Sequence, residues 1–162
     1  LYYRLMAGLL KWQRRRHGAR GQSPLVHKLT FETWARSVPD ARTDFDWLSA
    51  DPAQVNAYID DPKCGFECTT ATWLALVSAM AEVQSAKGLG RLPGRLPILL
   101  LGGRQDPMSN GGKGMDKLQQ ALTRRRLPLE RMDCPSGRHE ILNDFCAPGV
   151  RQALLEWLNR RI

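Results

Sequence analysis

The C-terminal part of the chain carries the pattern that most restricts its fold. Apolar residues run without alternation from Leu96 to Leu101, a helical pattern follows from Lys113 to Arg126, and a second short strand pattern spans Leu129 to Cys134. An apolar strand without alternation is typical of a parallel sheet that is buried on both faces. Because a strand–helix–strand unit crosses over right-handedly, its two strands point the same way. The sequence therefore predicts a parallel βαβ unit.

The rest of the chain is mainly helical. A terminal helix is expected over about residues 148–161, and helical patterns begin at Asp51-Pro52 and at Thr70, where a capping side chain or an early proline favours a helix start. Glycine, proline and basic residues between positions 86 and 97 read as a connector. The predicted fold class is α/β, with a helical region over residues 1–90 and a βαβα region over residues 91–162.

Two residues that suit acid–base chemistry follow the two strands. Asp106 comes after the first strand, in a Gly-Gly-Arg-Gln-Asp-Pro phrase, and His139 comes after the second. Carboxyl ends of parallel strands meet at one edge of a sheet, so the two side chains should lie close together. Singly, Asp106 could be a turn residue and His139 a loop histidine. Together, in this order, they are typical of the acid and base of a Ser-His-Asp hydrolase.

The third member of such a triad is missing. The elbow that exposes a nucleophilic serine has the pattern Gly-x-Ser-x-Gly, and none of the serines stands in it. The chain begins with Leu1 rather than Met, so we expect the serine to precede this sequence. The seven serines are Ser23, Ser37, Ser49, Ser78, Ser85, Ser109 and Ser136.

The strong positive charge does not by itself indicate nucleic acid. The net charge is +8 with a pI of about 9.8, but the arginines gather in runs that close helical patterns, at residues 14–16, 124–126 and 160–161. Cations there complement the carbonyl end of a helix, and no aromatic residues are interleaved as base stacking would need. Solvated helix ends are therefore favoured over a phosphate-binding surface, and no nucleic-acid partner is expected.

No cofactor or metal is expected. Gly111-Gly112-Lys113-Gly114 lacks the earlier glycine and the following Ser or Thr of a phosphate-binding loop. The four cysteines and the remaining histidines lack the spacing of a zinc site, which favours reduced cysteines in a cytoplasmic protein. No apolar run approaches the length of a membrane span, although a signal peptide would be lost with a missing N-terminus. The four cysteines are Cys64, Cys68, Cys134 and Cys146.

The first residues predict a basic amphipathic helix. Leu5, Leu9 and Trp12 recur at helical spacing, with arginine and lysine elsewhere on the turn. Such a helix could lie on a lipid surface, which would make the protein membrane-peripheral, or it could simply pack on its own domain. Trp34 and Trp47 lie further along and could belong to a lid that recognises acyl chains or to a small helical core.

At this point several motifs resemble one family. The segments DPMSNGGKG at residues 106–114, RHEILN at residues 138–143 and a terminal Trp-Leu at residues 157–158 are similar to the C-terminal half of bacterial α/β-hydrolases. The group is that of the monoacylglycerol lipases and lysophospholipases, labelled serine aminopeptidase S33 or hydrolase-4. TDFDWLS at residues 43–49 and DPKCGF at residues 61–66 resemble the cap region of the same group.

The resemblance implies a function and an incomplete site. Asp106 would be the triad acid, His139 the base, and residues 1–90 the cap of an α/β-hydrolase whose C-terminal part follows. From their positions on either side of His139, and independently of the resemblance, Arg138 and Glu140 are expected to form supporting salt bridges. The serine elbow and oxyanion hole belong to preceding strands, so we expect an esterase or lipase that requires the N-terminal half and an isolated chain that is inactive. The alternative is a truncated, non-catalytic fragment that acts only as a binding or membrane-surface module.

Overall fold

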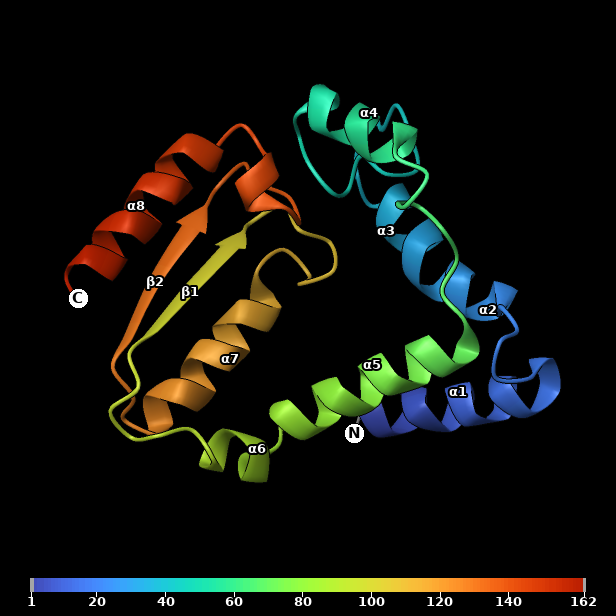
Figure 1. Ribbon diagram of the computed structural model, residues 1–162, viewed down its shortest axis with the longest axis horizontal. Coiled ribbons are helices and arrows are strands. Elements are labelled where there is room, and N and C mark those ends of the chain that lie inside the picture. Colours follow the sequence, from blue (N-terminus) through green and yellow to red (C-terminus); the bar gives the residue numbers. More distant parts are fainter. Residues whose placement is uncertain (1, 162) are drawn as a thin grey trace. The chain divides into compact units, whose positions relative to one another are not determined.

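The computed structural model describes residues 2–161, which form two compact units. One unit holds residues up to 32 together with residues 66–93, and the other holds residues 33–65 together with residues from 94 onward. Figure 1 shows the elements of both in chain order. The predicted α/β class is confirmed, because one unit contains helices and the other combines helices with a parallel sheet.

The all-helical unit is built on one helix pair. Helix α1 (Tyr2–His17) packs along α5 (Thr70–Val83), and the two lie side by side in Figure 1. Their buried contact centres on Leu10 and Val77, with Val26 joining from the segment between them. Helix α5 begins where Thr69 accepts a hydrogen bond from the Thr72 N–H, a side-chain cap typical of helix starts.

Short elements complete this unit. Helix α2 (Pro24–His27) starts at Ser23, whose hydroxyl accepts from the Val26 N–H at 3.2 Å. A π-helical turn, η1 (Lys28–Glu32), follows it, and α6 (Ala86–Gly90) ends the unit after α5. No helix within residues 2–161 is both long and apolar enough to cross a bilayer.

The second unit contains the predicted βαβ motif. Strands β1 (Ile98–Gly103) and β2 (Leu129–Cys134) are parallel and paired from Ile98 opposite Leu129 to Gly103 opposite Cys134. Helix α7 (Lys113–Arg124) connects them, and α8 (Ala147–Asn159) follows β2. In Figure 1, α7 and α8 lie on opposite sides of the two strands. This arrangement confirms the predicted parallel crossover.

The first strand begins and ends two residues later than predicted. Ile98 is the first residue to donate into the ladder, to the Pro128 carbonyl at 2.8 Å, since Pro97 before it has no N–H to donate. Gly102 and Gly103 continue the ladder instead of ending the strand. A Cβ at Gly103 would collide with the main-chain oxygens of Gly137 and Arg138. Glycine at this position therefore lets the loop after β2 approach β1 closely.

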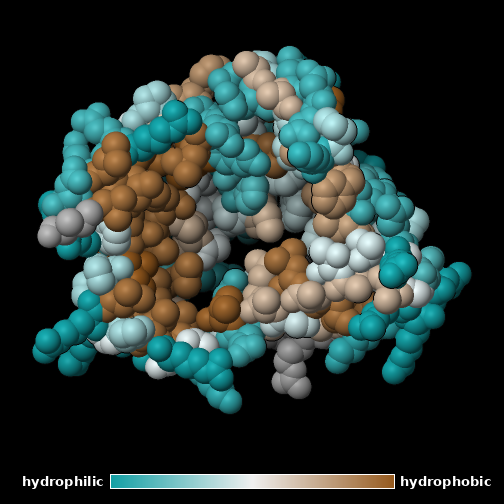
Figure 2. Space-filling model, in the orientation of Figure 1, coloured by the Kyte–Doolittle hydropathy of each residue, from teal (hydrophilic) through white to brown (hydrophobic). Residues whose placement is uncertain are grey.

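Apolar surface remains open on this unit. Its buried core centres on Cys134, Ile141 and Val150, but the leucines of β1 are only half-buried. Figure 2 shows hydrophobic side chains gathered over the strands on the face it presents. Within residues 2–161 the sheet has two strands, so one edge of β1 has no strand beside it.

Two cysteines of this unit are joined. A disulfide links Cys134 at the end of β2 to Cys146 just before α8, while Cys64 and Cys68 are free. The prediction of reduced cysteines is therefore wrong for Cys134 and Cys146. The error has a physical reason: spacing along the chain gave no sign that the turn after β2 folds back and brings these two side chains together.

Residues 33–65 also belong to the second unit. They include α3 (Thr33–Arg36) and α4 (Pro52–Asp60). Asp51 caps α4 by accepting from the Ala53 N–H at 2.9 Å, with proline at the first helical position, as the sequence predicts. This segment contacts the loop after β2 through its main chain. A cap role for residues 1–90 stays a prediction.

Candidate active site

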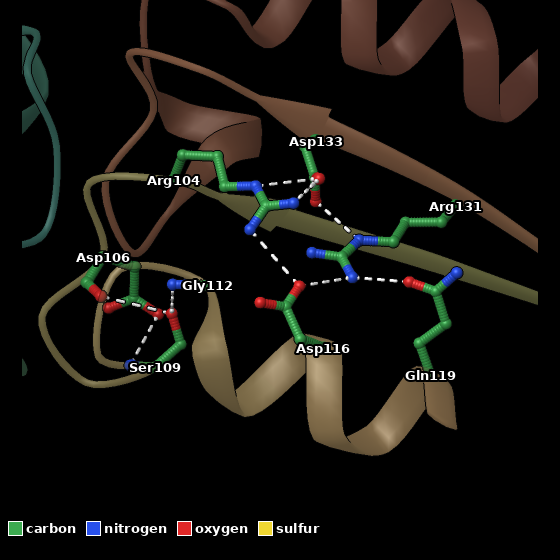
Figure 3. Close-up of polar contacts among 8 residues, drawn as sticks. All are labelled: Arg104, Asp106, Ser109, Gly112, Asp116, Gln119, Arg131 and Asp133. Atoms are coloured by element: carbon green, nitrogen blue, oxygen red, sulfur yellow. Dashed lines mark hydrogen bonds and ion pairs between the residues drawn. The ribbon is translucent and has the colours of Figure 1, made fainter. Parts of the chain in front are cut away.

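Asp106 is held by its own turn. One carboxylate oxygen accepts from the Met108 N–H at 2.9 Å. The other accepts from the Ser109 N–H at 3.2 Å (Figure 3). The Gly111 N–H donates to the Asp106 carbonyl at 2.9 Å. Asn110, Gly111 and Gly112 all have positive φ, which tightens the turn that leads into α7. The loop between β1 and α7, residues 104–112, is called the acid loop below.

His139 lies in the loop between β2 and α8, residues 135–146, called the base loop below. The loop returns to the acid loop at its start, where the Gln105 N–H donates to the Gly137 carbonyl at 2.9 Å. Its ends are tied by the disulfide between Cys134 and Cys146. The loop is therefore fixed at both ends against the strand edge from which Asp106 also emerges.

The two predicted residues meet. Nδ1 of His139 lies 3.3 Å from Oδ1 of Asp106. The Asp106 side chain is 12% exposed and that of His139 35% exposed, so the carboxylate is enclosed while part of the imidazole faces outward. A carboxylate on Nδ1 orients the ring and leaves Nε2 available to exchange a proton with another group.

The pair shifts the pKa of both members. Burial by itself would raise the pKa of Asp106, but contacts with His139, Ser109 and Met108 together lower it below the usual value. The hydrogen bond to Asp106 raises the pKa of His139, against the opposing effect of burial, and the charge of Glu140 adds to the increase. The geometry therefore favours an ionised aspartate beside a histidine that readily accepts a proton.

A salt-bridge network fixes the strand ends behind the acid loop (Figure 3). Arg104 contacts Asp133 at 2.6 Å and Asp116 at 3.3 Å, joining β1 to β2 and α7. Arg131 contacts the same two carboxylates, each at 2.8 Å. The hydrogen bond from Arg131 is the main cause of the lowered pKa of Asp116. Because Arg104 lies two residues before Asp106, this network anchors the start of the acid loop.

Main-chain hydrogen bonds join the base loop to residues 46–50, called the strap below. The Glu140 N–H donates to the Leu48 carbonyl at 2.7 Å, and the His139 N–H to the Trp47 carbonyl at 3.4 Å. Ser49 Oγ donates to the Asn143 carbonyl at 2.7 Å. The strap therefore lies along the base loop although more than ninety residues separate them in sequence.

The neighbours of His139 differ from the prediction. Instead of a salt bridge, Arg138 donates from Nη1 to the carbonyls of Asp46 at 2.6 Å and Ser49 at 3.0 Å. Glu140 accepts from the side-chain amide of Asn143 at 2.9 Å. The reason is that the strap presents main-chain oxygens to Arg138, which sequence spacing does not reveal.

One aromatic contact was also missed. The Trp47 ring lies against the His139 ring, with centroids 5.3 Å apart and planes at 45°. From the sequence, Trp47 was predicted only to belong to a lid or to a small helical core. At 4% exposure it is buried within its unit, and only a tertiary contact identifies it as a neighbour of His139.

Metal ligands are not grouped in the described part of the chain. Among residues 2–161, no three His, Cys, Asp or Glu side chains cluster in a way that could hold a metal ion. The site pairs His139, a proton acceptor, with the carboxylate of Asp106 at the edge of the sheet. Such a pair suits acid–base chemistry on a nearby hydroxyl group.

The family model for serine aminopeptidase S33, Hydrolase_4, matches residues 5–145. The chain therefore belongs to this family of α/β-hydrolases. No curated relative matches the sequence. The family assignment confirms the resemblance noted in the sequence and places the chain among hydrolases.

Solved structures show the same fold. A thermostable carboxyl esterase from Bacillus coagulans, in complex with glycerol, superposes with a TM-score of 0.86 at 21% identity. A lipase in its open form superposes with a TM-score of 0.79 at 22% identity. The alignments cover 97% and 94% of this chain but only 52% and 50% of those proteins. The chain thus spans about half the length of these structural relatives.

Proposed function

We propose that this chain is the cap and C-terminal part of a serine hydrolase that cleaves carboxylic esters. The observation that carries the proposal is the approach of His139 Nδ1 to Asp106 Oδ1, at 3.3 Å, beside the ends of two adjacent parallel strands. Membership of the hydrolase family and the fold shared with an esterase and a lipase support it. The family name refers to peptides, but nothing about this site favours an amide over an ester.

The proposed mechanism assigns one role to each residue. Nε2 of His139 takes the proton of a serine hydroxyl as its oxygen attacks the ester carbonyl, and Asp106 stabilises the imidazolium that forms. The tetrahedral intermediate collapses, the C–O bond to the alcohol breaks, and His139 gives its proton to the departing oxygen. Water then repeats the sequence on the acyl-enzyme and regenerates the serine.

The nucleophile in this proposal comes from strands that precede the chain. None of the serines within it stands in a Gly-x-Ser-x-Gly elbow. The open edge of β1 and its half-buried leucines suit a neighbouring strand from an N-terminal half. An isolated chain should therefore have no esterase activity. The proposed substrates are monoacylglycerol-like or lysophospholipid-like esters, in keeping with the family motifs.

The test is a His139→Ala substitution in the hydrolase completed with an N-terminal half that carries the serine elbow. Turnover of a chromogenic acetate ester should fall roughly ten-thousandfold or more, because the base is lost. His17→Ala, which removes a histidine at the end of α1, serves as the matched control and should keep the parent rate. Near-normal turnover by a folded His139→Ala protein would contradict the proposal.

A second role, at a lipid surface, is favoured by α1. Leu5 is 66% exposed and Trp12 50% exposed, while Arg14, Arg15 and Arg16 are exposed in the last turn. Exposed apolar and aromatic residues beside cations are typical of helices that lie in a membrane interface. We propose peripheral contact with an anionic membrane.

Sedimentation with vesicles tests this role. The chain should sediment with phosphatidylglycerol vesicles and much less with phosphatidylcholine vesicles, and Trp12→Ala should weaken the binding. Equal sedimentation with both vesicle types, unchanged by Trp12→Ala, would show that α1 does not bind anionic membranes.

A further inference from the structure

The orientation of the His139 ring needs an explanation beyond Asp106. A histidine side chain turns about two bonds, and the contact with Asp106 restrains it at one ring atom only, Nδ1. The His139 side chain is also 35% exposed, so other parts of the protein do not enclose it. A ring held at one point can still tilt, which would move Nε2 away from the hydroxyl that it must reach.

Trp47 supplies a second restraint on the ring. Its indole packs at 45° to the imidazole, with centroids 5.3 Å apart, within the range of favourable aromatic pairs. The indole is itself backed by Trp34, at 5.0 Å between centroids, and is almost fully buried. Trp47 therefore cannot swing aside without disturbing a packed aromatic neighbour.

The strap that carries Trp47 is anchored on both sides of it. Arg138 bridges the carbonyls of Asp46 and Ser49 with one guanidinium nitrogen. Oδ2 of the buried Asp144 accepts from the Arg138 N–H at 2.9 Å and from the Ala50 N–H at 3.1 Å. These contacts tie the main chain on either side of Trp47 to Arg138, the residue before His139, and to the side chain of Asp144.

We propose that Trp47 is a positioning residue for His139, and that the strap holds its indole against the imidazole so that Nδ1 stays on Asp106. This inference rests on the proposed role of His139 as the base. It also changes the expectation for Trp47, from a residue that senses acyl chains to one that orients the catalytic base.

The proposal predicts a particular kinetic effect. A small misplacement of a catalytic group costs rate rather than affinity, because substrate contacts elsewhere are unchanged. Trp47→Ala in the completed hydrolase should lower kcat by about tenfold to a hundredfold for a short-chain ester, with little change in KM. Trp47→Phe, which keeps an aromatic ring, should recover most of the rate.

A double-substitution cycle tests the orientation of the His139 ring without measuring turnover. The pKa of His139 is measured from the pH dependence of its modification by diethylpyrocarbonate, followed on the His139 peptide by mass spectrometry at low protein concentration. Asp106→Asn should lower this pKa in the parent chain. In a Trp47→Ala chain the same change should lower it far less, because the ring is no longer held on Asp106.

Matched variants separate positioning from general packing. Phe45→Ala removes an aromatic that packs on Tyr58, at 5.2 Å, just before the strap, and should leave the full effect of Asp106→Asn. If Trp47→Ala does not fold, the same pKa measurement is made in Trp47→Leu and in Arg138→Met. Arg138→Met removes the hydrogen bonds to the strap carbonyls of Asp46 and Ser49.

The outcomes are distinct. An equal pKa drop in the parent and Trp47 variants would overturn the positioning role. A reduced coupling in a hydrolase that never turns over esters would support positioning while the proposed function fails. No effect of Asp106→Asn on His139 in the parent would overturn both.

Discussion

The acid loop and the base loop stand side by side at one strand edge but are held in opposite ways. Asp106 accepts hydrogen bonds from residues two and three positions further on. The base loop depends on partners far away in sequence: the strap, about ninety residues earlier, and Gly103, across the sheet. The carboxylate of Asp106 is thus held by a local turn, whereas the base loop is assembled only when the unit folds.

This contrast indicates where the site is vulnerable. A local turn keeps most of its bonds even when packing loosens, because its partners stay close along the chain. A loop held by distant segments loses several bonds together when one anchor is removed. We therefore expect substitutions around His139 to cost more stability than equivalent substitutions around Asp106, whereas both sets affect turnover.

The largest expected effect tests the link between the loops. Asp106→Asn in the completed hydrolase should reduce kcat by roughly ten-thousandfold, because the imidazolium loses its counter-charge. Since Asp106 raises the pKa of His139, the acid limb of the residual pH–rate profile should move to lower pH. An acid limb that does not move would show that the two residues are uncoupled.

The same pair sets a window of pH for stability. The folded pKa of His139 lies above its ordinary 6.5. Its contribution to the free energy of unfolding is therefore complete below pH 6.5 and is lost as pH rises through the folded pKa. The folded pKa of Asp106 lies below 3.8, so its contribution is present above 3.8 and is lost as pH falls through the folded value. In urea unfolding measured across pH, Asp106→Asn should remove the dependence due to Asp106 and weaken the one due to His139, whose pKa is raised mainly by Asp106.

The next effect concerns the close approach of the base loop to β1. Gly103→Ala should lower the free energy of unfolding by about 3 kcal/mol, because its Cβ meets the main-chain oxygens of Gly137 and Arg138, which cannot rotate away. Gly102→Ala is the matched control, since its Cβ meets only the flexible side chain of Met115, whose nearest atom is 3.1 Å away. Equal losses in urea unfolding of the two variants would show that the loop is not packed so tightly.

A somewhat smaller effect comes from the cross-link of the base loop. Cys146→Ala should cost about 3 kcal/mol or less, the value for closing a loop of this size, since the bond spans 12 positions. Cys64→Ala, at a free thiol, should cost little. Titration of the unfolded, unreduced chain should find two thiols, Cys64 and Cys68. Four thiols would mean that the base loop is held by its noncovalent contacts alone.

The same contrast explains what the sequence could predict. The βαβ unit follows from an apolar run and a helical period, and both limits of β2 were predicted correctly. Asp106 and His139 could be named because each follows its own strand. Trp47, Arg138 and the disulfide partner of Cys134 act through contacts made only in the folded unit, and no local pattern marks them. Sequence therefore predicts the acid loop better than the base loop.

The smallest expected effect compares two serines that make the same kinds of bonds. Ser109 Oγ donates to the Asp106 carbonyl at 3.2 Å and accepts from the Gly112 N–H at 3.0 Å, all within the acid loop. Ser49 Oγ donates to the Asn143 carbonyl at 2.7 Å and accepts from the Asp51 N–H at 2.9 Å, joining the strap to the base loop.

Ser109→Ala should cost about 1 kcal/mol or less, because the turn keeps its other bonds, including those from the Met108 and Ser109 N–H groups to the Asp106 carboxylate. Ser49→Ala should cost about 2 kcal/mol, since Ser49 is itself buried and its bond to the Asn143 carbonyl joins two segments 94 residues apart. Urea unfolding of the two variants measures the difference directly, and proteolysis of the base loop should accelerate only in Ser49→Ala. A larger cost for Ser109→Ala would reverse the comparison and make the acid loop the weaker of the two.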